Sequence, residues 1–255
     1  MAISGPEALL YEKKDRIVTI TINRPERMNS MTAELIRMLS DAWTKFDEDD
    51  DAWVAILTGA GDKAFCAGRD LVEQAESGLP KELSLRYTPR EIWKPVIAAI
   101  NGFAVAGGWQ LAQSCDIRIA AEHAELGIAE TRWNMPAFWV ADLTRQINLG
   151  HALEVALWGD GRITAQRGYE MGWINRVVPQ EKLMEEALSW AERILYLAPR
   201  CVRNLKEILY RCYYMPPSEG IPFAKALEQN LEGMEDSVEG RKAFAEKRKP
   251  EFKNK

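Results

Sequence analysis

Histidine is scarce in this chain, and this limits the chemistry that it can perform. Its 255 residues include two histidines, His123 and His151, which excludes a three-histidine metal site and leaves few candidates for a Ser-His-Asp triad. The four cysteines show no C-x-x-C spacing, so we expect reduced thiols and no zinc ribbon or thioredoxin-type site.

Long apolar runs are also missing. No stretch approaches the roughly 18 uncharged apolar residues that a membrane span requires. The first residues lack the basic and apolar regions of a secretory signal. These absences predict a cytoplasmic protein with no membrane association.

Positive charge is in deficit: 33 lysines and arginines face 38 acidic residues, a formal net charge of −5. That balance disfavours a general nucleic-acid binder, which is usually basic. A large anionic ligand must therefore be met by local cations. The length indicates one large domain, or one domain with an appendage, that needs no disulfide or metal to fold.

The first part of the chain alternates strand and helix signals, which predicts an α/β arrangement with crossover connections. Thr32 is placed to cap a helix whose apolar residues recur at three- and four-residue spacing from Leu35 to Phe46. The predicted strands span residues 16–23, 53–58, 94–100 and 116–121.

Beyond Pro179 only helix signals remain. The predicted helices span residues 181–197, 199–213, 218–231 and 236–248. We therefore divide the chain into a catalytic body, 1–197, and a helical region, 198–255. Too little chain remains there for an independent core, so we expect the helical region to dock on the body or on another subunit.

Two segments concentrate small residues beside polar ones. Residues 65–71 read FCAGRDL, and residues 101–112 carry the paired glycines Gly107 and Gly108 where a helix is expected to begin. An amide at a helix start has no partner within the helix, and two such amides that converge would bind an oxyanion. The alternative interpretation is tight packing. A loose G-x-G-x-x-A match at 59–64 is better explained as a glycine turn than as a dinucleotide site.

These segments resemble the enoyl-CoA hydratase/isomerase (crotonase) superfamily, and the resemblance covers nearly the whole chain in order. It rests on RPERMNSM at 24–31, CAGRDL at 66–71, KPVIAAINGFAVAGGWQLAQSCDIRIA at 94–120, AEHAELGIAE at 121–130, GDGRITAQRGYEMGWINRVVP at 159–179 and EGRKAFAEKRKPEF at 239–252. It implies an α/β fold built as a spiral of ββα units, with a C-terminal helical region that forms homotrimers or hexamers. It also implies an acyl-CoA thioester as substrate.

The resemblance places the two amides of the family's oxyanion hole on Arg69 and Gly107. The segments around them are then expected to contact the substrate, through Cys66, Ala67, Gly68, Asp70, Leu71, Gly108 and Trp109. The Arg69 side chain is open to two interpretations, a surface arginine or a contact of the CoA phosphates. Arg27 is a similar candidate for the CoA nucleotide.

The acid–base residues depart from the family's hydratases, which carry two glutamates. The first position is Gln110 here, and the second is Glu130. An amide orients a proton but cannot take and return one, so Glu130 is the predicted acid/base. Family isomerases likewise keep the second glutamate and lack the first.

A second departure follows Glu130, where the hydratases are rich in glycine. This chain has aromatic residues instead, and Trp133, Phe138 and Trp139 are predicted to reshape the acyl pocket or to fill core. Asp142 is a weaker candidate for a second acid. An apolar site would raise the pKa of Glu130 toward working pH.

The sequence therefore favours double-bond isomerisation of an enoyl-CoA. The alternatives are an enoyl-CoA hydratase or acyl-CoA hydrolase on the same scaffold, and an acyl-CoA-binding subunit without activity. No metal or further cofactor is expected, since coenzyme A arrives as part of the substrate.

Overall fold

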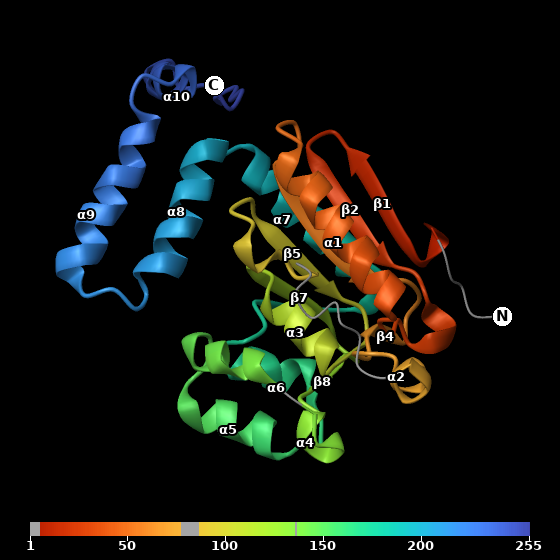
Figure 1. The fold of residues 1–255 in the computed structure, drawn as a ribbon. Coiled ribbons are helices and arrows are strands. Elements are labelled where there is room, and N and C mark those ends of the chain that lie inside the picture. The colour runs from red at the N-terminus through yellow and green to blue at the C-terminus, as the bar shows by residue number, and fades with distance from the viewer. Residues whose placement is uncertain (1–5, 78–86, 136) are drawn as a thin grey trace.

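The computed structural model describes residues 6–77, 87–135 and 137–255. A mainly parallel sheet forms the centre of the body (Figure 1). Its strands, in spatial order, are β1 (Leu9–Lys14), β2 (Ile17–Ile22), β3 (Val54–Gly59), β5 (Val96–Ile100), β7 (Ile117–Ala121) and β10 (Arg176–Val178). Only β1 runs antiparallel to its neighbour in this sheet as described.

Helices cover both faces of this sheet, as parallel strands with apolar side chains on both faces require. Helix α1 (Ala33–Glu48) begins where the Thr32 hydroxyl accepts a hydrogen bond from the Leu35 amide, as predicted. Its buried face includes Trp43 and Phe46 and joins the core that contains Ile20 of β2. Helix α7 (Leu183–Leu195) packs Ala187 and other small residues on the opposite face.

A second, smaller sheet carries the chain toward the site. Its order is β4 (Ala64–Cys66), β6 (Phe103–Val105), β8 (Glu125–Gly127) and β9 (Ile163–Thr164). The connecting helices here are α2 (Leu71–Ser77), α3 (Gly107–Gln113), α4 (Glu130–Trp133), the 3₁₀ segment η5 (Phe138–Arg145), α5 (Leu149–Leu157) and α6 (Ala165–Glu170). Strand β4 leads into α2, β6 into α3 and β8 into α4, so three neighbouring strand ends deliver the site's segments.

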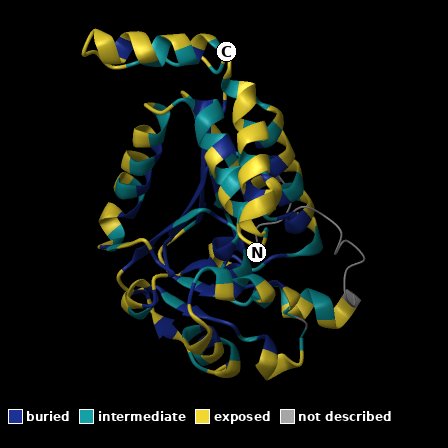
Figure 2. Ribbon diagram, turned by 90° about the vertical axis from the view of Figure 1, so that its left-hand side faces the viewer, coloured by how far each residue is buried: buried dark blue, intermediate teal, exposed yellow. Residues whose placement is uncertain are grey.

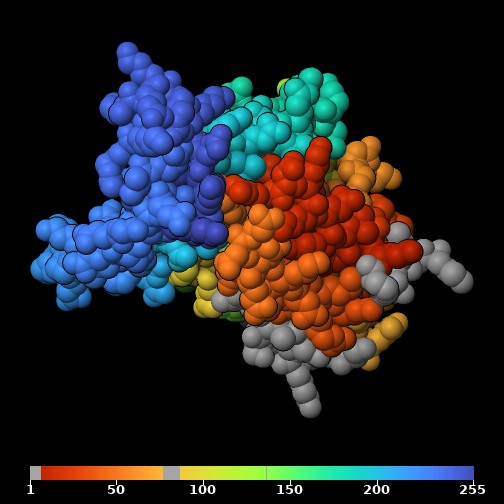
Figure 3. Space-filling view, turned by 90° about the horizontal axis from the view of Figure 1, so that it is seen from above, coloured from red at the N-terminus to blue at the C-terminus, as the bar shows by residue number. Residues whose placement is uncertain are grey.

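The chain ends in helices that stand away from the sheets (Figures 1 and 3). They are α8 (Pro199–Cys212), α9 (Pro217–Glu228) and α10 (Glu235–Ala245). The predicted helices over 181–248 are therefore confirmed, with bounds shifted by a few residues. Lys206 of α8 joins this region to the body through an ion pair with Asp116 at 2.7 Å.

Burial follows this division (Figure 2). The strands of the body are buried, whereas α8, α9 and the turn between them leave large apolar side chains in solvent, among them Leu209, Tyr214 and Ile221. No helix in the described ranges is long and apolar enough to cross a membrane.

Candidate active site

Two glycines allow the loop after β4 to lie directly against the start of α3. A Cβ atom on Gly108 would lie 1.8 Å from the Cys66 carbonyl oxygen, so only glycine fits there. Gly68 has a φ of +91°, which favours glycine, and a Cβ on it would lie 3.1 Å from the Gly107 nitrogen. The close approach brings the amides of Arg69 and Gly107 to the same place.

Both amides are free to bind a ligand. Met31 pairs with the Arg69 loop through its own amide, which donates to the Gly68 carbonyl, and its own carbonyl, which accepts from the Asp70 amide. Neither of these two hydrogen bonds uses the Arg69 amide. Among the described residues, neither the Arg69 amide nor the Gly107 amide has a hydrogen-bond acceptor. Two convergent, unpaired N–H groups are suited to an oxyanion.

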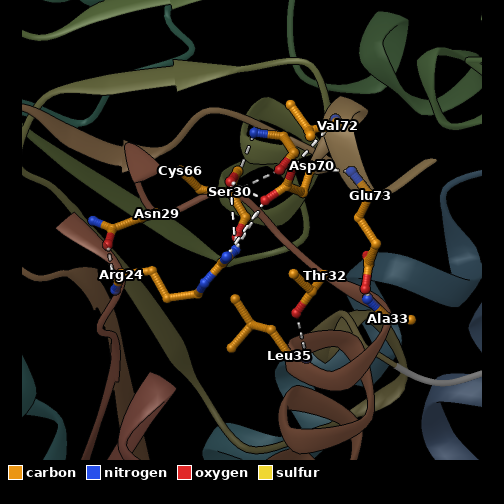
Figure 4. A network of polar contacts seen from close by, with 11 residues as sticks. Arg24, Asn29, Ser30, Thr32, Ala33, Leu35, Cys66, Asp70, Val72 and Glu73 are labelled. Carbon is orange, nitrogen blue, oxygen red and sulfur yellow. Dashed lines mark hydrogen bonds and ion pairs between the residues drawn. The ribbon is translucent and has the colours of Figure 1, made fainter. Parts of the chain in front are cut away.

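Asp70 fixes the loop that carries the Arg69 amide (Figure 4). One oxygen of its carboxylate accepts from the Ser30 hydroxyl at 3.2 Å and contacts the Arg24 guanidinium at 3.4 Å. The other accepts from the amides of Val72 and Glu73. Burial alone would raise the pKa of Asp70, but the hydrogen bonds and the Arg24 charge hold it below its usual range. Asp70 is thus a positioning residue on the far side of the loop from the site.

Glu130 begins α4, directly after β8 and Ala129. Glu130 is only 7% exposed. One of its carboxyl oxygens, Oε2, is buried without a hydrogen-bond partner among the described residues. Burial raises the pKa of Glu130 from 4.5 to about 7, against a smaller opposing effect of backbone amides. A carboxyl group in this state gains and loses a proton near neutral pH.

Gln110 lies one helical turn into α3 and is held by Tyr87. The Tyr87 hydroxyl donates to Gln110 Oε1 at 2.6 Å, and the Tyr87 carbonyl accepts from the indole of Trp43 at 3.0 Å. Because its oxygen is occupied, Gln110 presents its amide nitrogen as a donor. Tyr87 was not predicted from the sequence, and no local motif marks it.

These groups line one cavity of about 300 Å³. Of the residues expected to contact substrate, it is lined by Ala67, Arg69, Leu71, Gly107, Gln110, Glu130, Trp133, Phe138 and Trp139. Glu130 is the one carboxylic acid on its wall within the described residues. The lining also includes Tyr87, Gln74 and Arg132.

The other expected contacts lie outside this lining. Trp109 is a core side chain and not a substrate contact: it is fully buried, stacks on Trp173 with ring centres 4.0 Å apart, and donates to Gln113. It faces away because it precedes Gln110 by one position on α3. Four expected contacts belong to the segments that carry the lining residues but do not line the cavity themselves: Cys66, Gly68, Asp70 and Gly108. Arg27, in the turn after β2, does not line the cavity either.

A second chamber of about 360 Å³ continues beyond Gln110. It shares Tyr87, Gln110, Phe138 and Trp139 with the first cavity. Its other walls come mainly from η5, α3, β7 and α8. Asp142 lines this chamber and is paired with Arg90, so the structure places it away from Glu130 as a structural ion-pair partner.

The comparisons with known proteins agree with this geometry. The family model described as enoyl-CoA hydratase/isomerase matches residues 12–255. The chain is 35% identical to enoyl-CoA hydratase EchA19 of Mycobacterium tuberculosis, with 98% of each chain covered. It is 36% identical to (E)-benzylidenesuccinyl-CoA hydratase of Thauera aromatica, with 95% of this chain and 97% of the relative covered.

Solved structures give the same result. An enoyl-CoA hydratase from Mycobacterium tuberculosis superposes with a TM-score of 0.91 at 34% identity, over 98% of this chain and 100% of that one. A Bacillus anthracis enoyl-CoA hydratase superposes with a TM-score of 0.90 at 35% identity, over 97% and 100%. The fold and site define a crotonase-type acyl-CoA protein, as predicted. The chain belongs to the enoyl-CoA hydratase/isomerase family.

Proposed function

We propose that this family member is an enoyl-CoA isomerase that moves a double bond along the acyl chain with a single carboxylate. The observation that carries the proposal is the isolation of Glu130 as the one acid on the cavity wall within the described residues, buried and without a partner on Oε2. Isomerisation needs one group that removes a proton and returns it elsewhere. Hydration ordinarily uses two carboxylates, and the first of the two positions is Gln110 here.

The proposed mechanism starts with the thioester oxygen accepting hydrogen bonds from the Arg69 and Gly107 amides. The Glu130 carboxylate removes a proton from an acyl carbon, and the electron pair of that C–H bond delocalises onto the thioester oxygen. The same proton then returns from Glu130 to a different carbon, and the double bond is left shifted. Because burial raises its pKa to about 7, Glu130 is a stronger base than an ordinary carboxylate. Removing one amide donor from such a site typically costs about 10²–10³ in rate.

Hydration is the second candidate, because the two relatives compared above are named as hydratases. In that reaction Gln110, oriented by Tyr87, would hold a water molecule through its amide nitrogen while Glu130 takes its proton. The oxygen of that water would bond to an acyl carbon, and Glu130 would return the proton to the neighbouring carbon. This requires one carboxylate to serve both steps.

Incubation of 2-enoyl-CoA and 3-enoyl-CoA substrates in H₂¹⁸O separates the two reactions. An isomerase gives a product of unchanged mass without ¹⁸O, whereas a hydratase gives a hydroxyacyl-CoA that carries one. Release of free coenzyme A thiol would indicate the hydrolase instead. Binding of these thioesters without turnover would indicate a subunit without activity.

The variant Gln110→Glu sharpens the distinction, since it restores a second carboxylate at the hydratase position. We expect it to gain hydration relative to isomerisation, with Gln110→Ala as the control that removes the amide without adding charge. Equal hydration by the wild type and Gln110→Glu would contradict the isomerase proposal.

We also propose that the helical region, 198–255, joins copies of the chain as a trimer or hexamer. Its exposed apolar side chains support this, among them Leu205, Leu209, Tyr213, Tyr214 and Ile221. Light scattering on the eluting protein tests it, and a monomeric mass would refute it. The proposed chemistry needs no cofactor beyond the coenzyme A of the substrate, and Arg27 stays a candidate for its nucleotide.

A further inference from the structure

Gln110 lies where the two chambers of the site meet, and its amide nitrogen has no partner in the protein as described. The side chain lines both the cavity that holds Glu130 and the chamber beyond it. Its oxygen accepts a hydrogen bond from the Tyr87 hydroxyl at 2.6 Å. Among the described residues Nε2 of Gln110 donates to no acceptor, and unlike Nη1 of Arg69 it stays accessible. Its N–H bonds therefore face space that a ligand occupies.

A chain of hydrogen bonds determines which atom of the Gln110 amide faces that space. The Arg69 guanidinium donates to the Tyr87 hydroxyl oxygen, so the hydroxyl hydrogen is left to donate to Gln110. Trp43 donates to the Tyr87 carbonyl at 3.0 Å and holds the Tyr87 backbone in place. A rotation that exchanged the oxygen and nitrogen of Gln110 would leave the Tyr87 hydroxyl without its acceptor. Gln110 is thus held with its nitrogen toward the ligand.

The described residues on the walls do not supply the missing acceptor. The carboxyl group of Glu130 accepts hydrogen bonds from neighbouring backbone amides. In the far chamber, Asp116 forms an ion pair with Lys206 at 2.7 Å. Asp142, on the same wall, is paired with Arg90. Because these charges are balanced within the protein and an amide carries none, the acceptor that Gln110 lacks need not be charged.

A purely apolar acyl chain suits this arrangement poorly. It would displace water from the Gln110 N–H bonds and put no acceptor in its place, which is unfavourable. An acyl group that carries an oxygen atom beside Gln110 would replace the water without that loss. A glutamate at this position would present only acceptors when ionised, whereas the glutamine presents donors.

The place of Gln110 indicates which part of the acyl group it meets. The oxyanion-hole amide of Gly107 and the side chain of Glu130 line the first cavity, where the double bond is moved. Gln110 follows Gly107 by three residues on α3, about 4.5 Å along the helix axis. An acyl group that passes Gln110 continues into the far chamber. The oxygen is therefore expected just beyond the second, third and fourth carbons that take part in the isomerisation.

We propose that the substrate is an acyl-CoA with an uncharged oxygen acceptor on its fifth or sixth carbon and that the Gln110 amide binds this oxygen. The inference rests on the proposed function, since it names the class of acyl-CoA on which that same site acts. Gln110 is then a specificity residue that touches the substrate. Tyr87 and Arg69 are positioning residues that act through it.

Calorimetry with saturated, unreactive thioesters tests this without turnover. Each carbonyl ligand is compared with one of similar shape in which a methyl group replaces the oxygen. The pairs are 5-oxohexanoyl-CoA with 5-methylhexanoyl-CoA, and 6-oxoheptanoyl-CoA with 6-methylheptanoyl-CoA. We expect at least one carbonyl ligand to bind about threefold or more tightly than its methyl counterpart, the effect of one hydrogen bond between uncharged groups. Equal or weaker binding of both carbonyl ligands would overturn the proposal.

Variants then locate the effect. Gln110→Leu should abolish the preference, and Tyr87→Phe should reduce it while the methyl ligands bind as before. Gln166→Leu, on the exposed side of α6, is the matched control and should keep the full preference. An unchanged preference in Gln110→Leu would overturn the assignment to Gln110. Equal weakening of carbonyl and methyl ligands in that variant would also overturn it, because Gln110 would then shape the cavity without binding the oxygen.

The binding measurement stays separate from the proposed function. If the carbonyl thioesters bind selectively but no enoyl-CoA is isomerised, the recognition by Gln110 stands and the isomerase proposal fails. If enoyl-CoA is isomerised while carbonyl and methyl ligands bind equally, the proposed function stands and this inference fails.

Discussion

Glu130→Gln should stabilise the protein while it removes activity. Burial raises the pKa of Glu130 from 4.5 to about 7 in the folded protein, and the unfolded chain keeps the ordinary value. The folded form therefore binds more protons between these two values, and stability falls as pH rises through them. Above about pH 7 the folded protein must hold a buried carboxylate.

The size of the effect follows from the two pKa values. At pH 8 the raised pKa lowers the free energy of unfolding by about 3 kcal/mol per chain. At pH 5 the same linkage lowers it by about 1 kcal/mol. For a chain of this length, 1 kcal/mol corresponds to about 2–4 °C in Tm. Glutamine has nearly the same shape without the charge, so the variant should gain about 6–12 °C at pH 8 and about 2–4 °C at pH 5.

Thermal melts of the two proteins at both pH values, at one protein concentration, provide the assay. Glu192→Gln, on the exposed side of α7, is the matched control and should show little change at either pH. Turnover of the best enoyl-CoA should fall by about 10²–10⁴ in Glu130→Gln. A Tm gain no larger at pH 8 than at pH 5 would refute the reasoning from burial.

Four further predictions follow from the geometry. In the wild type, kcat/KM should rise with pH through about 7 as Glu130 loses its proton, and a profile flat from pH 5.5 to 8.5 would contradict this. Gly108→Ala should cost at least about 10² in kcat/KM, because its Cβ collides with the Cys66 carbonyl and moves the amides apart; stopped-flow assays of the purified variant measure this, and full activity would contradict it. Tyr87→Phe should lower kcat/KM about tenfold with little change in Tm, since the ring is kept and the hydroxyl's hydrogen bonds to Gln110 and Arg69 are lost. Asp70→Asn should lower both Tm and kcat while thioester binding persists, and unchanged kcat would show that the Asp70 hydrogen bonds do not position the Arg69 amide.

Local sequence signals predicted β2, β3, β5 and β7 of the larger sheet and the helices α1 and α7, but not β1, β10 or the smaller sheet. The Thr32 cap, the apolar face from Leu35 to Phe46 and the buried β-branched strands each depend on neighbours within one or two turns. The paired glycines at 107–108 likewise predicted the start of α3. The folded structure keeps the elements that such short-range signals predict, because tertiary packing favours the same elements.

The arrangement of side chains around the cavity depends on contacts distant in sequence. Tyr87 reaches Gln110 from a segment 23 residues away, and no spacing rule signals that hydrogen bond. Trp109 carries a large ring beside two glycines, yet its partner is Trp173 in the core. The Arg69 guanidinium lies 5.9 Å from the centre of the Tyr87 ring, another contact that local reasoning did not reach.

In the proposed mechanism, two backbone amides bind the thioester oxygen while one carboxylate faces the acyl carbons. A crystal structure with an unreactive acyl-CoA bound tests it most directly. We expect the thioester oxygen within about 2.7–3.1 Å of both the Arg69 and Gly107 nitrogens, with Glu130 against the neighbouring carbons. A thioester oxygen bound elsewhere, or Glu130 turned away from the acyl chain, would contradict it.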